Sequence, residues 1–225
     1  MKRHITSVMS RRDVVHLSIR VELLKHIDEQ IPGFTLRQKS NSSFMKVLSF
    51  LLFFNKKFMT HYTTTIYPVV YVPDFWGKYK SYGSLEHEIL AHEYVHMYDR
   101  KRLGWLFNIL YLSPQVFALF ALGAFWNPWF LLSLIFLLPW PSPGRAWLEF
   151  RGYRMSIAYQ HWTKHKKCDI YRVVERFTGP NYYYMFPFKK LLEKWFNKEL
   201  EKIKKDELSP ELVEIKQVIE RGLDV

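Results

Sequence analysis

The sequence predicts an α+β protein that is predominantly helical. Apolar residues recur with helical spacing along most of the 225 residues. Residues 63–72 are instead rich in β-branched and aromatic residues, which is typical of a strand in a small sheet. This length allows one domain with a sizeable core. We therefore expect a single domain over residues 1–225, with a hydrophobic insertion at about 104–141.

The N-terminal third is expected to form scaffold. Apolar residues from Val14 to Ile27 keep helical spacing until Pro32-Gly33 stops the run, and residues 44–54 form a second, strongly apolar helix. Proline cannot donate a ladder hydrogen bond, so the prolines within and after residues 63–72 predict an edge strand. Such an edge could hold an extended peptide by strand addition, or it could be an ordinary sheet edge.

A helix over residues 84–103 carries the pattern His92-Glu93-Tyr94-Val95-His96. Positions i and i+4 lie on one helix face, so both imidazoles can reach a single Zn²⁺ ion. Glu93 then lies beside the open position of the metal, where a general base is needed. The pattern predicts a zinc hydrolase. The alternative is a pair of incidental surface histidines in a chain that has nine.

A catalytic zinc site usually has a third protein ligand. Glu149 is the only acidic residue between Asp99 and Asp169, and it lies in a basic and aromatic helical stretch. An isolated anion in such a stretch is a candidate ligand. The alternative is a surface ion pair with Arg145, four residues earlier on the same helix.

The segment Glu149-Phe150-Arg151-Gly152 resembles the E-F-R-A segment of the membrane-embedded gluzincin peptidases, the family of the CaaX prenyl proteases and heat-shock membrane proteases. In that family an H-E-x-x-H helix, a hydrophobic helical pair and a glutamate-bearing helix follow one another, as they do here over residues 84–160. The resemblance implies a zincin-like fold and a zinc metallopeptidase acting on protein or peptide substrates. It also implies Zn²⁺ bound by His92, His96 and Glu149, with Glu93 as general base.

Two further residues are candidates for supporting the metal ligands. The family usually has an aspartate four residues after the ligand glutamate, where this chain has Tyr153. Asp99 follows His96 on the same helical face and could orient a histidine, since zinc-bound histidine donates its second N–H to an acceptor. The alternative for Asp99 is an exposed pair with Arg100 or Arg102. An oxyanion donor could come from Tyr153, residues 182–184 or His161, each of which could equally serve packing.

Residues 103–144 contain no charged residue and no histidine. Residues 105–126 are long enough to cross a bilayer core, with Pro114 as a kink, whereas residues 129–138 are too short. We expect a hairpin turning at Asn127-Pro128. Its ends carry tryptophans that anchor at membrane interfaces, namely Trp105, Trp126, Trp129 and Trp140. A buried hairpin of a soluble protein, or an oligomer contact, is the alternative.

The charge of the chain bears on its partners and location. A formal net charge of +12 attracts anionic lipid or nucleic acid, and the hydrophobic hairpin makes a lipid bilayer the simpler partner. Basic residues on both sides of the hairpin predict that the active site faces the cytoplasm. A soluble cytoplasmic protein is the alternative. One cysteine, Cys168, excludes an internal disulfide, and residues 1–13 lack the apolar region of a secretory signal.

The C-terminal part is expected to contain three more helices. One covers residues 170–177, the others begin near Pro187 and Pro210, and Gly222 ends the last. Two other functional classes stay open. One is a SprT-like basic metalloprotease that acts on DNA-bound proteins, which would explain the charge but does not need the uncharged stretch. The other is a non-catalytic membrane or virion structural protein with a relict motif.

Overall fold

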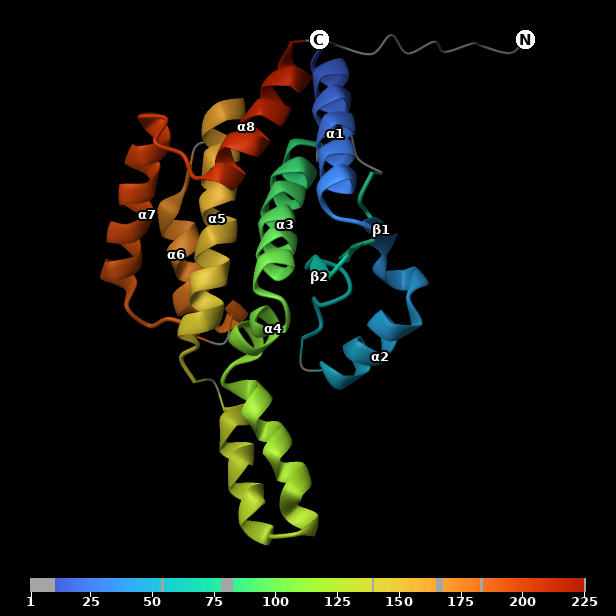
Figure 1. The fold of residues 1–225 in the computed structure, drawn as a ribbon, viewed down its shortest axis with the longest axis vertical. Coiled ribbons are helices and arrows are strands. Elements are labelled where there is room, and N and C mark those ends of the chain that lie inside the picture. Colours follow the sequence, from blue (N-terminus) through green and yellow to red (C-terminus); the bar gives the residue numbers. More distant parts are fainter. Residues whose placement is uncertain are drawn as a thin grey trace, which may run out of the picture. The chain divides into compact units, whose positions relative to one another are not determined.

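The computed structural model describes residues 11–53, 55–77, 83–138, 140–164, 168–182 and 184–224. Over these ranges the chain is mostly helical, with one three-stranded mixed sheet (Figure 1). The predicted α+β, predominantly α, class is confirmed.

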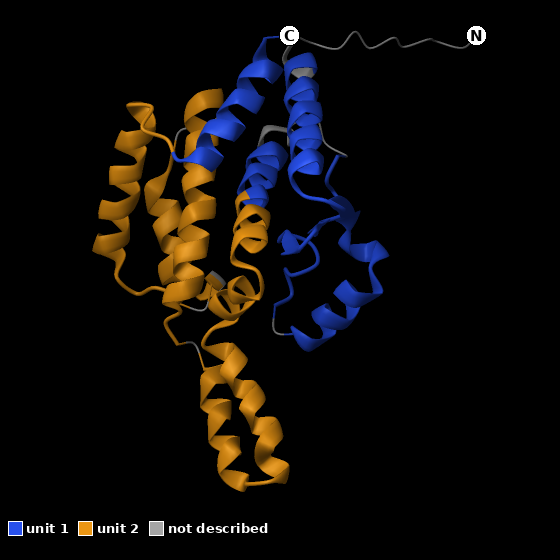
Figure 2. Ribbon diagram, viewed as in Figure 1, with its two compact units in different colours: residues 1–94, 209–225 blue, residues 95–208 orange. Residues whose placement is uncertain are grey.

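The chain divides into two compact units, residues 1–94 with 209–225 and residues 95–208 (Figure 2). The division falls inside one continuous helix, α3 (Gly83–Leu103), which contributes residues to both units. The single domain expected from the length stays a prediction.

The first unit is built around two helices, α1 (Arg11–Gln30) and α8 (Pro210–Leu223), which pack against each other. Gly222 does not end α8 as predicted, because the helix continues to Leu223. A Cβ atom added at Gly222 would lie 2.7 Å from Cα of Ile19. The glycine is therefore needed for the close approach of α8 to α1, not for a C-cap.

The sheet of the first unit has the order β1-β3-β2 and contains β1 (Thr35–Gln38), β2 (Thr64–Ile66) and β3 (Val69–Val72). β1 pairs parallel and β2 antiparallel with β3. The single edge strand predicted over residues 63–72 is thus a hairpin whose second strand is central. Pro68 lies in the turn and Pro73 follows β3, so neither interrupts the ladder. The edge assignment holds only for β2.

Helix α2 (Ser43–Leu51) covers part of this unit's core. The side chain of Ser42 caps it by accepting a hydrogen bond of 3.2 Å from the backbone N–H of Met45. Met45 is fully buried against Phe58 and Tyr71, and Leu48 and Leu52 pack on the same cluster. The apolar residues at helical spacing on one face of α2 therefore belong to the core.

The second unit is helical within its described residues. Helix α5 (Pro143–Thr163) packs against α4 (Trp105–Leu112) and α7 (Lys189–Lys204), and α7 also packs against α6 (Ile170–Thr178). A short 3₁₀ turn, η5 (Pro180–Tyr182), follows α6. Aromatic rings fill the space between these helices, and the ring of Phe196 contacts those of Phe150 and Phe177. These contacts hold α5, the helix that carries Glu149.

The uncharged stretch forms a hairpin of two 3₁₀ helices, η3 (Gln115–Phe125) and η4 (Pro128–Leu137). It turns at Asn127, as predicted, and the Asn127 side chain accepts a hydrogen bond of 3.0 Å from the N–H of Trp129. The first arm is broken, because α4 meets η3 at an angle of 93°. Within the described residues no single helix is long and apolar enough to cross a membrane, whereas this bent pair meets the length and composition criteria together.

Candidate metal centre

Helix α3 positions the two histidines of the sequence motif. Its C-terminal turn carries Arg100, Lys101 and Arg102, which interact favourably with the negative end of the helix dipole. His92 and His96 lie one turn apart in its middle, and both are buried, with 8% and 5% of their surface exposed. The predicted arrangement of two imidazoles on one helix face is therefore present, and the alternative of two surface histidines is wrong.

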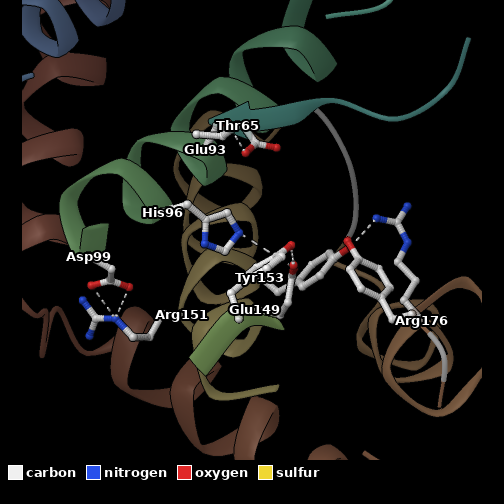
Figure 3. A network of polar contacts seen from close by, with 10 residues as sticks. Thr65, Glu93, His96, Asp99, Glu149, Arg151, Tyr153 and Arg176 are labelled. Atoms are coloured by element: carbon white, nitrogen blue, oxygen red, sulfur yellow. Dashed lines mark hydrogen bonds and ion pairs between the residues drawn. The ribbon is translucent and has the colours of Figure 1, made fainter. Parts of the chain in front are cut away.

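Glu149 lies beside His96 inside the second unit. Its Oε2 atom faces Nε2 of His96 (Figure 3), at 3.8 Å, and 1% of the residue's surface is exposed. His92 precedes His96 on the same continuous helix. One ligand atom from each of the three residues lies within 4.8 Å of the other two. The three residues that the sequence suggested as ligands therefore form a buried cluster that could hold a metal ion.

The donor set suits zinc. Two imidazole nitrogens and one carboxylate oxygen are ligands that Zn²⁺ takes in catalytic sites, where a fourth position is kept for water. Bond lengths of about 2.1 Å in a tetrahedral site would put ligand atoms about 3.4 Å apart. The separations here, 3.8 Å and at most 4.8 Å, are slightly wider. Binding would thus shorten these separations by up to about 1.4 Å, a shift that rotamer adjustments can provide.

Helix α4 contacts both the histidine and the glutamate of this cluster. The hydroxyl of Tyr111 donates a hydrogen bond of 2.5 Å to Oε1 of Glu149. The rings of Tyr111 and Phe107 stand edge-on to the ring of His96, with centroids 5.9 and 6.2 Å away. The Arg145 guanidinium, the alternative partner of Glu149, stacks over the ring of Tyr111 at 5.0 Å. Tyr111 thus leaves Oε2 of Glu149 as the oxygen facing His96.

The structure gives Glu93 a partner that the sequence did not suggest. The Thr65 hydroxyl, from β2, donates a hydrogen bond of 2.7 Å to Oε2 of Glu93 (Figure 3). Glu93 is largely buried, with 9% of its surface exposed. Within the first unit, the carboxylate of the motif is therefore held against the edge strand of the sheet.

A buried lysine adds positive charge near Glu93. Lys39 is fully buried, and its Nζ atom donates a hydrogen bond of 2.7 Å to the carbonyl oxygen of Phe58. The same atom lies 3.8 Å from the centre of the Phe58 ring. Burial lowers the pKa of Lys39 to about 8, although the negative charge of Glu93 opposes the shift. Lys39 was missed in the sequence because nothing in a lone lysine signals burial.

Asp99 is buried, so the exposed pair expected as an alternative is wrong, and its carboxylate pairs with Arg151. Both of its carboxylate oxygens accept from Nε of Arg151, at 3.1 and 2.8 Å (Figure 3). Arg151 also stacks over the ring of Trp147. The pair ties α3 to α5 close to the residues that carry His96 and Glu149. Arg151 is two residues after Glu149 on the helix, so its side chain points in a different direction from the side chain of Glu149.

Tyr153, the residue at the family's aspartate position, belongs to a tyrosine–arginine cluster. Its hydroxyl lies 3.0 Å from that of Tyr182 and accepts a hydrogen bond of 2.9 Å from Arg176 (Figure 3). Burial raises the pKa of both phenols, and the charge of Glu149 raises them further. Both hydroxyls therefore stay protonated at neutral pH and can donate hydrogen bonds.

The other candidate oxyanion donors are placed less favourably. His161 is exposed on α5, twelve residues beyond Glu149, which corresponds to about 18 Å along the helix. Tyr184 is exposed, and Tyr183 lies outside the described residues. Among these candidates, Tyr153 and Tyr182 are the ones whose pKa values respond to the charge of Glu149.

Comparison with known protein families, curated proteins and solved structures found no match. The class of site therefore rests on its own residues. Two histidines of α3 and a glutamate of α5 form a buried cluster, and a second glutamate, on α3, is held by a threonine.

Proposed function

We propose that this protein is a zinc-dependent endopeptidase of the gluzincin type, with a zincin-like arrangement of sheet, motif helix and glutamate helix. The observation that carries the proposal is the convergence of His92, His96 and Glu149, whose ligand atoms lie within 4.8 Å of one another in buried positions. Two residues of one helix and a third, 53 positions later, come together. Their side chains supply the types of donor atom that zinc binds. Surface histidines or a surface ion pair would not need this burial.

The residues around the cluster have distinct tasks in peptide hydrolysis. Zinc bound there would lower the pKa of a water molecule and polarise the scissile carbonyl. Glu93 would take the proton of the attacking water and pass it to the leaving amine. Thr65 already donates to Oε2 of Glu93, so Oε1 is the oxygen that takes the proton. Tyr111 holds Glu149 in its ligand orientation by the bond to Oε1.

The edge strand supports a peptide as substrate. β2 pairs with β3 on one side, and its other side is the edge of the sheet. An extended substrate could bind there through backbone hydrogen bonds, which are insensitive to sequence. The contact of Thr65 with Glu93 would place such a strand beside the proposed general base.

Metal content is the first test. Purified protein should contain one zinc per chain, and His92→Ala or His96→Ala should lose it, because a site without one of its three ligands loses most of its affinity. His161→Ala, which removes an exposed histidine from α5, is the matched control and should keep the metal. Zinc-free wild type after refolding with zinc present would refute the metal site.

Measuring the rate of hydrolysis separates zinc binding from catalysis. Glu93→Gln should retain zinc, while hydrolysis of an unfolded protein substrate falls at least about a hundredfold, since general-base catalysis contributes roughly 10² to 10⁴. Glu201→Gln changes an exposed glutamate of α7 and should leave turnover unchanged. Full activity in Glu93→Gln would exclude Glu93 as the base.

The exposed hairpin supports membrane association, with the active site on the cytoplasmic side. Its large apolar side chains are turned outward, including Phe125 at 96% and Trp126 at 85% exposure. A 3₁₀ helix rises about 2.0 Å per residue, so η3 measures about 22 Å, against about 30 Å for the hydrocarbon core. The hairpin would therefore enter the bilayer without crossing it, and both of its ends would stay on one side.

A salt wash tests this anchor. Hydrophobic insertion is not screened by ions, so the protein should stay in the membrane fraction at a salt concentration that removes basic peripheral proteins. Leu119→Arg, at an exposed position of η3, should shift protein to the soluble or degraded pool. Leu191→Arg on α7 is the matched control. A monodisperse wild type that needs neither detergent nor lipid would refute the anchor and leave the zinc proposal untouched.

A further inference from the structure

The first unit carries an apolar surface of its own on α2. While Met45, Leu48 and Leu52 face the core, the opposite face of the helix exposes Phe44, Val47, Phe50 and Leu51, and Phe53 follows just beyond its end. Phe50 and Phe53 are 79% and 78% exposed, which is unusual for phenylalanine. We call these five residues the α2 patch. The second unit contributes no residue to it.

The chain segment that carries the α2 patch is basic, and the first acidic residue after it, Asp74, accepts a hydrogen bond of 2.6 Å from Ser40. Residues 30–73 contain three lysines and one arginine on the surface and no aspartate or glutamate. Lys46 lies on α2 itself, and Lys56 and Lys57 follow Phe53 within four residues; all three are exposed. An apolar helix face with cations along its border is typical of a helix that lies in a membrane interface, its apolar side chains entering the acyl boundary and its lysines reaching the headgroups.

We propose that the α2 patch binds the headgroup region of an anionic lipid bilayer, as an interfacial contact separate from the hairpin. This inference rests on the bilayer association proposed above and names the lipid chemistry that the first unit recognises. Anchoring by a single weak signal is marginal, and two signals together make membrane binding stable. The hairpin supplies hydrophobic insertion, and the α2 patch adds selectivity for negative lipid.

The charges around the α2 patch favour lipid over other occupants. A second copy of the chain bound through the same face would bring Lys46, Lys56 and Lys57 of both copies together, and no acidic side chain in residues 30–73 would offset the repulsion. Nucleic acid would match the lysines, and bases could stack on the phenylalanines, but the aliphatic side chains of Val47 and Leu51 would stay exposed to water beside its charged backbone. A negatively charged bilayer satisfies both the lysines and the apolar face.

The test places an environment-sensitive fluorophore on the patch of the full-length chain. Phe50→Cys is labelled in a Cys168→Ser background, and the protein is reconstituted into vesicles of phosphatidylcholine with or without phosphatidylserine. With phosphatidylserine the label should move to the interface, so iodide in the water should quench it at least about threefold less than without, given an insertion depth of about 5–10 Å. A label at Glu201→Cys, on the exposed face of α7, is the control and should not change.

The lysines provide a matched variant. Lys56→Gln with Lys57→Gln should lower the protection of position 50 in phosphatidylserine vesicles, since each lysine near an anionic surface contributes about fivefold to partitioning. Zinc content should be the same in this variant. Lys198→Gln with Lys202→Gln, on α7, removes the same charge elsewhere and should keep the protection.

Three results would overturn the inference. Equal iodide quenching at position 50 in both vesicle types, while the protein remains bound to them, would show that the hairpin alone contacts lipid. Protection that depends on protein concentration without anionic lipid would assign the patch to a second copy. Protection by double-stranded DNA in place of lipid would assign it to nucleic acid. A protein that leaves both vesicle types altogether is a different result, which refutes the hairpin anchor on which the inference rests, so the two failures are distinguishable.

Discussion

Replacing Lys39 by methionine should alter the dependence of stability on pH. Methionine keeps the length and flexibility of the buried side chain, and therefore the contact with the ring of Phe58, but removes the charge. In the folded chain the pKa of Lys39 is lowered to about 8 by burial, from 10.5 in the unfolded chain. Between these two values the unfolded state binds more protons than the folded state.

The size of the effect follows from this difference. Stability rises with pH wherever the unfolded state binds more protons, so the lysine destabilises the fold below pH 8 and this penalty disappears as pH approaches 10.5. From pH 7 to pH 9.5 the free energy of unfolding of the wild type should gain about 2 kcal/mol from this one group. Lys39→Met should lack this gain. At pH 7 the variant should match or exceed the wild type, because the lost hydrogen bond to Phe58 is worth only about 1 kcal/mol.

Urea unfolding followed by circular dichroism, repeated at half-unit steps of pH, measures the effect. The useful quantity is the difference between wild type and variant, because other groups cancel in it. Lys56→Met, at an exposed lysine of the same segment, should run parallel to the wild type. Glu93→Gln should move the rise to lower pH, since Glu93 raises the pKa of Lys39. Parallel curves for Lys39→Met and wild type would refute the assignment of a buried, destabilised charge.

Three further predictions concern contacts near the metal cluster and within the first unit. Tyr111→Phe removes the donor to Glu149 and should weaken zinc binding by about 10- to 100-fold in a chelator competition; an unchanged affinity would mean that the bond does not orient the ligand. Arg151→Met leaves Asp99 buried without its partner and should cost about 3–5 kcal/mol of unfolding free energy in urea; a loss below 1 kcal/mol would argue against a buried pair. Gly222→Ala introduces a Cβ atom 2.7 Å from Ile19 and should lower the stability by about 1–3 kcal/mol in thermal unfolding, and a neutral result would contradict the close packing of α8 on α1.

Local patterns in the sequence were sufficient to predict most helices and the two histidines. The boundaries of α3 and α6 and the end of α1 follow from apolar spacing, from charged helix ends and from Pro-Gly breaks, which act within a few residues. The same local reasoning placed residues 63–72 in one edge strand. The pattern within this segment does not reveal that β1 pairs with β3, which makes β3 the central strand. A four-residue strand with one apolar side chain carries too little pattern to be recognised.

The three residues of the buried cluster could be picked out from the sequence, whereas the contacts that surround them could not. Glu149 stood out because it was the only anion in a long basic and apolar stretch. Tyr111 and Thr65 contact Glu149 and Glu93 across 38 and 28 positions of sequence, and no spacing rule connects residues so far apart. Asp99 was recognised as unusual, but its partner Arg151 lies 52 positions away and depends on how α3 and α5 pack.

Helix α4 belongs to two neighbourhoods at once. One side bears Tyr111 and Phe107 against Glu149 and His96, and the other exposes Trp105 and Leu112, just before the hairpin begins. A ligand bound at the exposed side and a metal bound at the other therefore share one structural element. Thermodynamic linkage makes such coupling reciprocal. If the ligand at the exposed side changes the affinity for the metal by some factor, the metal changes the affinity for that ligand by the same factor. If zinc binds the cluster, the coupling free energy can be measured from either side, as the effect of attachment on zinc affinity or of zinc on attachment.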